Sequence, residues 1–216
     1  MATDPAGKAW QSIARDLVER LPGRWRTAGT GIRTVLVREP IEWVVVWVGT
    51  SRMRRSDPPY LMGGEAELVG PPFTLAKGHG IRSDERRGKP SQIDPTAPDA
   101  AAAIEAFVVE DVLPRVDPWT PERLAAVAEE QLVVPMRERG RPIIFQNAAG
   151  WRVILSDESP EDPAEQAAGW FGESGSPEES EWYRQLAAAW RSGGRAEALR
   201  YLEGERTKAL ASLKLA

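Results

Sequence analysis

Any histidine chemistry in this chain depends on one residue, because His79 is the only histidine. It lies in the segment 77–85 between Gly78 and Gly80, which allow the backbone unusual dihedral angles. A histidine in such a setting, with Asp84 nearby, could act as a general base. The alternative is an ordinary histidine at the end of a strand, hydrogen-bonded to water or to a carbonyl. Since no second catalytic motif accompanies His79, we favour this alternative.

Two carboxylates alternate along a predicted strand, Glu65 and Glu67. Alternate residues of a strand point to the same side, about 7 Å apart. That spacing suits a divalent cation or an acid–base pair. It is also typical of the solvated face of an outer strand, whose charges discourage edge pairing, and we favour this interpretation. A small hydrolytic enzyme using His79, Glu65 and Glu67 therefore stays an alternative hypothesis.

Two clusters of arginines form the main surface feature of the sequence, one after the longest apolar run and one in a predicted long loop. If the sheet brings both clusters to the same end, they form a patch suited to phosphate or carboxylate groups. The 28 basic residues comprise 23 arginines and only 5 lysines, a skew that indicates a GC-rich bacterial genome. The predicted anion- or partner-binding residues are Arg52, Arg54, Arg55, Arg82, Arg86 and Arg87.

Several chemistries are excluded by residue type. The chain has no cysteine, so disulfides, thiolate metal sites and cysteine nucleophiles are impossible, and one histidine cannot form a multi-histidine metal site. Gly29-Thr30-Gly31 begins like a dinucleotide-binding motif, but it leads into a β-branched run and not into a helix. We therefore expect no metal and no cofactor.

The overall composition is that of a globular protein. With 216 residues, 42% hydrophobic and 28% charged, the chain suits one or at most two domains. No apolar run approaches the ~20 residues of a membrane span, and the N-terminus lacks a signal-peptide pattern, so we expect a cytoplasmic protein without a membrane partner. Residues 1–96 carry 15 basic and 11 acidic residues, whereas residues 97–216 carry 13 and 21. A basic half joined to an acidic half is compatible with an acidic partner for the first half.

The candidate residues must be positioned by a sheet with helices packed on it. Asp4 and Pro5 predict the start of a helix that ends at Pro22-Gly23. The segment Ile41–Gly49 is apolar on both faces, which is typical of a central strand. Short connections between it and its neighbours predict an α+β fold with an antiparallel meander of about five to seven strands. The other expected strands are residues 32–38, 60–62, 65–69, 73–77, and a hairpin formed by 143–146 and 151–155.

Helices are expected to follow the meander. We predict helices over residues 100–113 and 120–133, and a short helix over 164–171. The sequence Ser176-Pro177-Glu178-Glu179 has the form of a capping box, and Gly193-Gly194 separates the helix that it begins from a last helix. This pattern predicts a C-terminal helical hairpin. The predicted domains are an α+β domain over residues 1–157 and a helical tail packed on it over residues 158–216.

The function can be predicted only in outline. The chain has 9 tryptophans, and exposed tryptophan is enriched at protein interfaces. Our leading hypothesis is a non-catalytic bacterial protein-binding module whose partner is another protein. The order of helix, meander and helices is similar to that of small bacterial α+β proteins that include toxin-neutralising types, which suggests an immunity- or antitoxin-like accessory. The first alternative is binding of nucleic acid or a phosphorylated ligand through the loop arginines, and the second is the hydrolytic enzyme.

Overall fold

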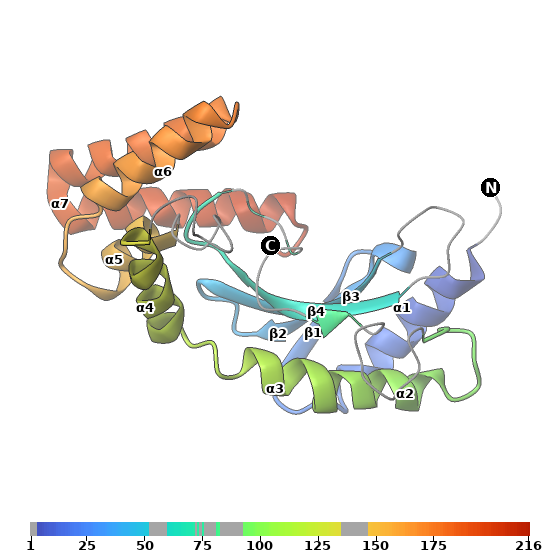
Figure 1. Ribbon diagram of the computed structural model, residues 1–216. Coiled ribbons are helices and arrows are strands. Elements are labelled where there is room, and N and C mark those ends of the chain that lie inside the picture. The colour runs from blue at the N-terminus through green and yellow to red at the C-terminus, as the bar shows by residue number, and fades with distance from the viewer. Residues whose placement is uncertain are drawn as a thin grey trace. The chain divides into compact units, whose positions relative to one another are not determined.

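The computed structural model describes residues 4–51, 60–71, 73, 75, 81–82, 93–134 and 147–216 (Figure 1). It is an α+β protein with an antiparallel sheet, as predicted. The chain divides into two compact units. The first contains the residues up to Ala66, those from 74 to Pro118, and Leu215; the second contains Glu67–Phe73, Trp119–Lys214 and Ala216. The division into an independent domain over 1–157 and a tail over 158–216 stays a prediction.

The sheet belongs largely to the first unit, and its strands follow one another in chain order. Neighbouring strands pair antiparallel between β1 and β2, β2 and β3, and β4 and β5. Four strands have five residues or more and the fifth has two, so the predicted range of five to seven is matched only in part. The strands are β1 (Arg24–Ala28), β2 (Val35–Glu39), β3 (Val44–Ser51), β4 (Tyr60–Glu67) and β5 (Ile81–Arg82).

Strand β3 lies in the middle of the sheet, which confirms the interpretation of its sequence as a central strand. Alternate residues point to opposite faces, and both sets are buried: Val48 is 0% exposed on one face, and Val45 and Trp47 are 0% and 7% exposed on the other. Trp43, which precedes the strand, is half-buried. Sheltering on both faces explains why this segment contains no polar residue between Val44 and Val48.

Helix α1 (Pro5–Leu17) begins as the sequence predicts. The Asp4 carboxylate accepts a hydrogen bond from the Gly7 N–H at 3.3 Å, and Pro5 occupies the first turn. Trp10 is fully buried in α1, and its Nε1–H donates to the Thr34 carbonyl at 2.8 Å. This bond fixes the helix to the chain just before β2. The predicted start of β2 at residue 32 is wrong, because residues 31–33 form a 3₁₀ turn, η1, next to α1.

One face of the sheet is covered by α1 and by a second helical segment that runs from residue 100 to 116 (Figure 1). This segment comprises α2 (Ala100–Phe107), a π-helical turn η3 (Val108–Val112) and α3 (Leu113–Val116). In the π turn the Leu113 N–H donates to the Val108 carbonyl, and Pro114, which has no N–H, follows at once. The helix therefore continues through Pro114, beyond its predicted end at residue 113.

Strand β4 crosses Gly63-Gly64 without interruption, so the prediction of two strands separated by this pair is wrong. The reason is close packing. A Cβ atom on Gly63 would lie 2.6 and 2.8 Å from the two methyl carbons of Val112, which is too close for any side chain. Glycine is needed here because η3 packs directly on the strand, and not because the chain turns.

The second unit is helical and contains α4 (Pro121–Leu132), α5 (Ala148–Leu155), α6 (Glu161–Glu173) and α7 (Pro177–Ser212). The predicted hairpin is wrong for residues 151–155, which belong to α5; residues 143–146 lie outside the described residues. Helix α5 buries Trp151 and Val153 and packs against the segment Glu67–Phe73, with a Cβ on Gly150 only 2.2 Å from the Val69 carbonyl. This packing outweighs the β propensity of its branched residues.

Helix α7 matches the predicted helical hairpin in part. Its 36 residues form two helical stretches joined at a kink, where Gly193 and Gly194 have non-helical dihedral angles, with φ of +61° at Gly194. Only glycine adopts that conformation readily. We call residues 177–192 the first arm of α7 and residues 195–212 the second arm. Ser176 precedes the helix as predicted, although its side chain makes no capping hydrogen bond.

Candidate functional site

Most of the arginine clusters and the histidine lie outside the described residues. This applies to Arg52, Arg54, Arg55, Arg86, Arg87 and His79. Arg82 belongs to β5, where its backbone pairs with Met62 of β4. Whether the two clusters share one end of the sheet therefore stays a prediction.

The two strand glutamates do not form a solvated outer face. Glu65 is 1% exposed, and Glu67 is half-buried with its Oε2 accepting a hydrogen bond from Trp151 Nε1 at 2.5 Å. The prediction fails because β4 is covered at these positions: Glu65 is buried, and Trp151 of α5 contacts Glu67. Their role as catalytic candidates beside His79 remains untested.

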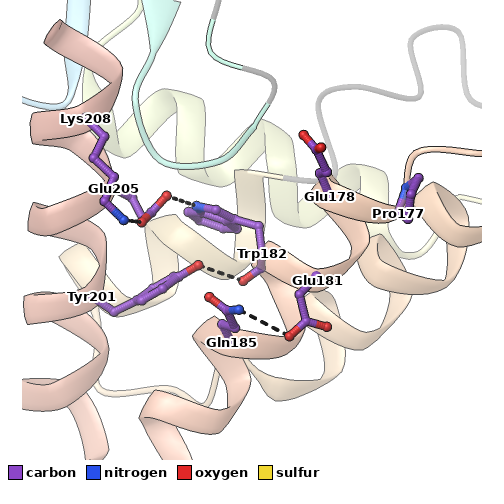
Figure 2. A pocket seen from close by; sticks show the side chains of 8 residues that line it. All are labelled: Pro177, Glu178, Glu181, Trp182, Gln185, Tyr201, Glu205 and Lys208. Atoms are coloured by element: carbon purple, nitrogen blue, oxygen red, sulfur yellow. Dashed lines mark hydrogen bonds and ion pairs between the residues drawn. The ribbon is translucent and has the colours of Figure 1, made fainter. Parts of the chain in front are cut away.

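A pocket in the second unit is a stronger candidate site. It has a volume of about 470 Å³ and lies between the two arms of α7 (Figure 2). Its lining combines two aromatic rings, three carboxylates, an amide and one ammonium group. We call it the α7 pocket, and its residues are Pro177, Glu178, Glu181, Trp182, Gln185, Tyr201, Glu205 and Lys208.

The break at Gly193-Gly194 allows the two arms to face each other across this pocket. Arg195, the first residue of the second arm, donates hydrogen bonds to the carbonyls of Val153 (2.9 Å) and Ile154 (2.7 Å) at the end of α5. These carbonyls have no partner within their own helix, so the guanidinium caps α5 and fixes the start of the second arm.

The Glu205 carboxylate is held by two hydrogen bonds, one across the pocket from the first arm and one from its own arm. Trp182 Nε1–H of the first arm donates to Glu205 Oε2 at 3.1 Å, and Lys208 Nζ donates to Glu205 Oε1 at 2.6 Å (Figure 2). The Trp182 indole is buried, whereas the Lys208 side chain is 76% exposed. The Glu205 carboxylate is thus anchored on its inner side and meets a solvated ammonium on its outer side.

Tyr201 closes the pocket from the second arm. Its hydroxyl donates to the Trp182 carbonyl at 3.1 Å, and its ring centroid lies 5.5 Å from that of Trp182 at an angle of 53°. Burial, followed by the negative charges of Glu205 and Glu181, raises the pKa of Tyr201 well above its ordinary value. The phenol therefore stays protonated at neutral pH and serves as a hydrogen-bond donor, not as a base.

The rim of the pocket is acidic and exposed. Glu178 and Glu181 are one turn apart on the first arm, so they share one face. Glu181 accepts a hydrogen bond from Gln185 Nε2 at 3.2 Å, while its side chain remains 54% exposed. With Glu205, three carboxylates line the pocket; Lys208 pairs with Glu205, and Arg184, outside the lining, lies 3.7 Å from Glu181. A net negative site with two aromatic rings suits an organic cation.

The described residues give no support for a metal site, since no group of three or more potential ligands is found among them. Within the same part of the chain, no helix is both long and apolar enough to cross a membrane.

Sequence reasoning missed the α7 pocket. Trp182 lies on the apolar stripe of its helix and is buried, but a stripe alone does not show which polar residues share its face. Glu178, Glu181 and Gln185 recur at spacings of three and four residues, and so do Tyr201, Glu205 and Lys208. These spacings place each set on one side of its arm. The predicted hairpin, combined with these spacings, is the signal that could have identified the pocket.

No known protein family, curated protein or solved structure matches the chain.

Proposed function

We propose that this protein is a non-catalytic binding module for another protein, and that the α7 pocket is its contact site for a cationic segment of that partner. The observation that carries the proposal is the anchored Glu205 carboxylate between Trp182 and Lys208, in a pocket whose rim is acidic. The pocket is open to solvent, so a side chain of another protein can reach it from outside.

The chemistry of the pocket favours binding over catalysis. Tyr201 is held protonated by the raised pKa described above, so it is a poor general base at neutral pH. Glu205 uses both carboxylate oxygens in hydrogen bonds to side chains of the protein. While Lys208 stays in place, neither Tyr201 nor Glu205 directs an oxygen at a substrate proton.

The composition of the pocket supports a protein partner. Tryptophan and tyrosine are enriched among residues that dominate binding energy, and a surrounding rim of exposed polar groups is typical of protein interfaces. Carboxylates on the rim attract a basic segment and repel nucleic-acid phosphates. The alternative of nucleic-acid binding therefore applies to the loop arginines and not to this pocket.

The more specific role of an immunity- or antitoxin-like accessory stays a prediction. It requires that the partner be a toxin encoded beside this protein. Identification of the partner decides between this role and that of a general binding module.

The test compares partner capture by three versions of the protein. Glu178→Gln combined with Glu181→Gln removes the rim charge. Glu130→Gln combined with Glu173→Gln removes the same charge from exposed positions on α4 and α6. We expect one host protein to be retained by the wild type and by the α4/α6 variant, and lost from the pocket variant. Failure to retain any protein, or equal retention by both variants, would refute the proposal.

A further inference from the structure

We propose that the α7 pocket recognises an arginine side chain, and that Lys208 occupies the position of its guanidinium on Glu205 when no ligand is bound. This inference names the chemical group that the pocket binds. It rests on the proposed function only in assigning that arginine to a partner protein. Because a free arginine derivative has the same guanidinium, the pocket can be tested without the partner.

The ion pair between Lys208 and Glu205 has the properties of a displaceable contact. The two residues are three positions apart on the second arm and their charged atoms are 2.6 Å apart. The lysine side chain is 76% exposed and the glutamate side chain 18% exposed. Exposed ion pairs of this kind contribute little net free energy, so an incoming cation can replace the ammonium at small cost.

The other partner of Glu205 is not displaceable in this way. Trp182 is 7% exposed and its indole donates to Glu205 from inside the unit. The carboxylate therefore keeps its orientation when Lys208 leaves, with Oε1 available to a ligand. A preorganised acceptor of this kind reduces the entropy lost on binding.

Arginine suits the pocket better than lysine for two reasons. Its planar guanidinium donates several hydrogen bonds at once, which allows it to contact Glu205 of one arm while Glu178 and Glu181 of the other arm provide opposite charge. It is also more weakly hydrated than an ammonium and stacks on aromatic rings, and the half-buried ring of Tyr201 provides one.

The same contact would be expected if Lys208 only stabilised the second arm. The two explanations predict opposite effects of removing the ammonium. If Lys208 competes with the ligand, Lys208→Met increases affinity for an arginine probe, because the variant retains Glu205 and loses the competitor. If Lys208 is purely structural, the variant leaves affinity unchanged or lowers it.

The experiment follows the indole N–H signal of Trp182 by nuclear magnetic resonance while N-acetyl-arginine methylamide is added. Loss of one signal in Trp182→Phe assigns it. N-acetyl-lysine methylamide is the competing probe, and N-acetyl-glutamine methylamide with added sodium chloride controls for ionic strength. We expect saturable movement of the signal with the arginine probe and weaker binding of the lysine probe. Lys208→Met should bind the arginine probe about two- to five-fold more tightly, the range of an exposed ion pair.

Further variants make each outcome decisive. Lys214→Met removes an equivalent exposed charge outside the pocket and should leave the affinity within the error of the wild type. Glu181→Gln should weaken binding without disturbing the Trp182 hydrogen bond. No movement of the signal, tighter binding of the lysine probe, or unchanged affinity in Lys208→Met would each overturn the inference. Partner capture that still depends on the rim carboxylates would then leave the proposed function standing.

Discussion

Replacement of Tyr183 by phenylalanine should stabilise the second unit. The Tyr183 side chain is fully buried, and its ring is stacked on Phe171 at 5.7 Å between centroids and 15° between planes. Its hydroxyl has no hydrogen-bond partner among the described residues. Burying a hydroxyl without a partner costs about 1–3 kcal/mol. Tyr183→Phe keeps the ring and removes that cost, so we expect a gain of about 1 kcal/mol after subtracting the lost contacts of the oxygen.

The gain should depend on pH in a defined direction. Burial, followed by the negative charge of Glu67, raises the pKa of Tyr183 well above its ordinary value. A group whose pKa is raised on folding stabilises the protein fully below its unfolded pKa, near 10, and loses that contribution as the pH rises toward its folded pKa. The wild type should therefore lose about 1.4 kcal/mol per pH unit above pH ~10 through this residue, and Tyr183→Phe should not.

Urea unfolding measured at pH 7 and pH 11 tests both statements. Gly70 provides an internal control, because its Cβ would lie 2.4 Å from the Tyr183 hydroxyl and 3.3 Å from Cζ. Gly70→Ala should destabilise the wild type by about 1–3 kcal/mol through overpacking, and Tyr183→Phe should recover part of that loss. A destabilised Tyr183→Phe protein at pH 7, or strict additivity of the two substitutions, would refute the reasoning.

Three further predictions concern other contacts. Gly63→Ala should destabilise the first unit by about 1–3 kcal/mol, because its Cβ would lie 2.6 Å from a methyl carbon of Val112. Adding Val112→Ala should recover part of that stability. Thermal unfolding of the single and double variants measures both effects, and a double variant no more stable than Gly63→Ala would contradict the prediction. Arg195→Met should lower the free energy of unfolding by about 1–2 kcal/mol, because it removes the hydrogen bonds that cap α5. Arg200→Met, which removes an exposed charge from the same arm, should lower it by less than about 0.5 kcal/mol. Equal urea midpoints for the two variants would contradict the capping role of Arg195. Tyr201→Phe should reduce the loss of stability above pH ~10, because burial raises the pKa of Tyr201, and an unchanged alkaline profile would exclude that cause.

The parts of the fold that could be predicted are those governed by local pattern. Asp4 and Pro5 fix the start of α1 through the backbone itself, and the two-sided apolar run over Ile41–Gly49 can be satisfied only inside a sheet. The parts that could not be predicted depend on contacts distant in sequence. Gly63 resembles a turn residue until Val112 is known to press on it, and residues 151–155 resemble a strand until α5 is seen packed on the segment Glu67–Phe73.

The α7 pocket also depends on residues distant in sequence, and the sequence indicates it only when the predicted hairpin is combined with the spacing of its polar residues. Its residues come from two arms separated by Gly193-Gly194, and only the dihedral angles at these glycines determine which faces meet. The sequence pointed instead to loop arginines, because clustered charge is visible along a chain while a carboxylate paired across a hairpin is not. A cluster of charges along the sequence therefore does not predict a site whose residues come from two facing helices.

The central claim, that a partner places an arginine in the α7 pocket, is tested most directly by photocrosslinking in the host cell. Gln185→p-benzoylphenylalanine places the reactive group in the pocket, and Arg200→p-benzoylphenylalanine places it on the same helix outside the pocket. We predict an adduct with one partner protein from position 185 and not from position 200, with the crosslinked partner peptide containing arginine. The absence of an adduct at position 185, or the same adducts from both positions, would contradict the account.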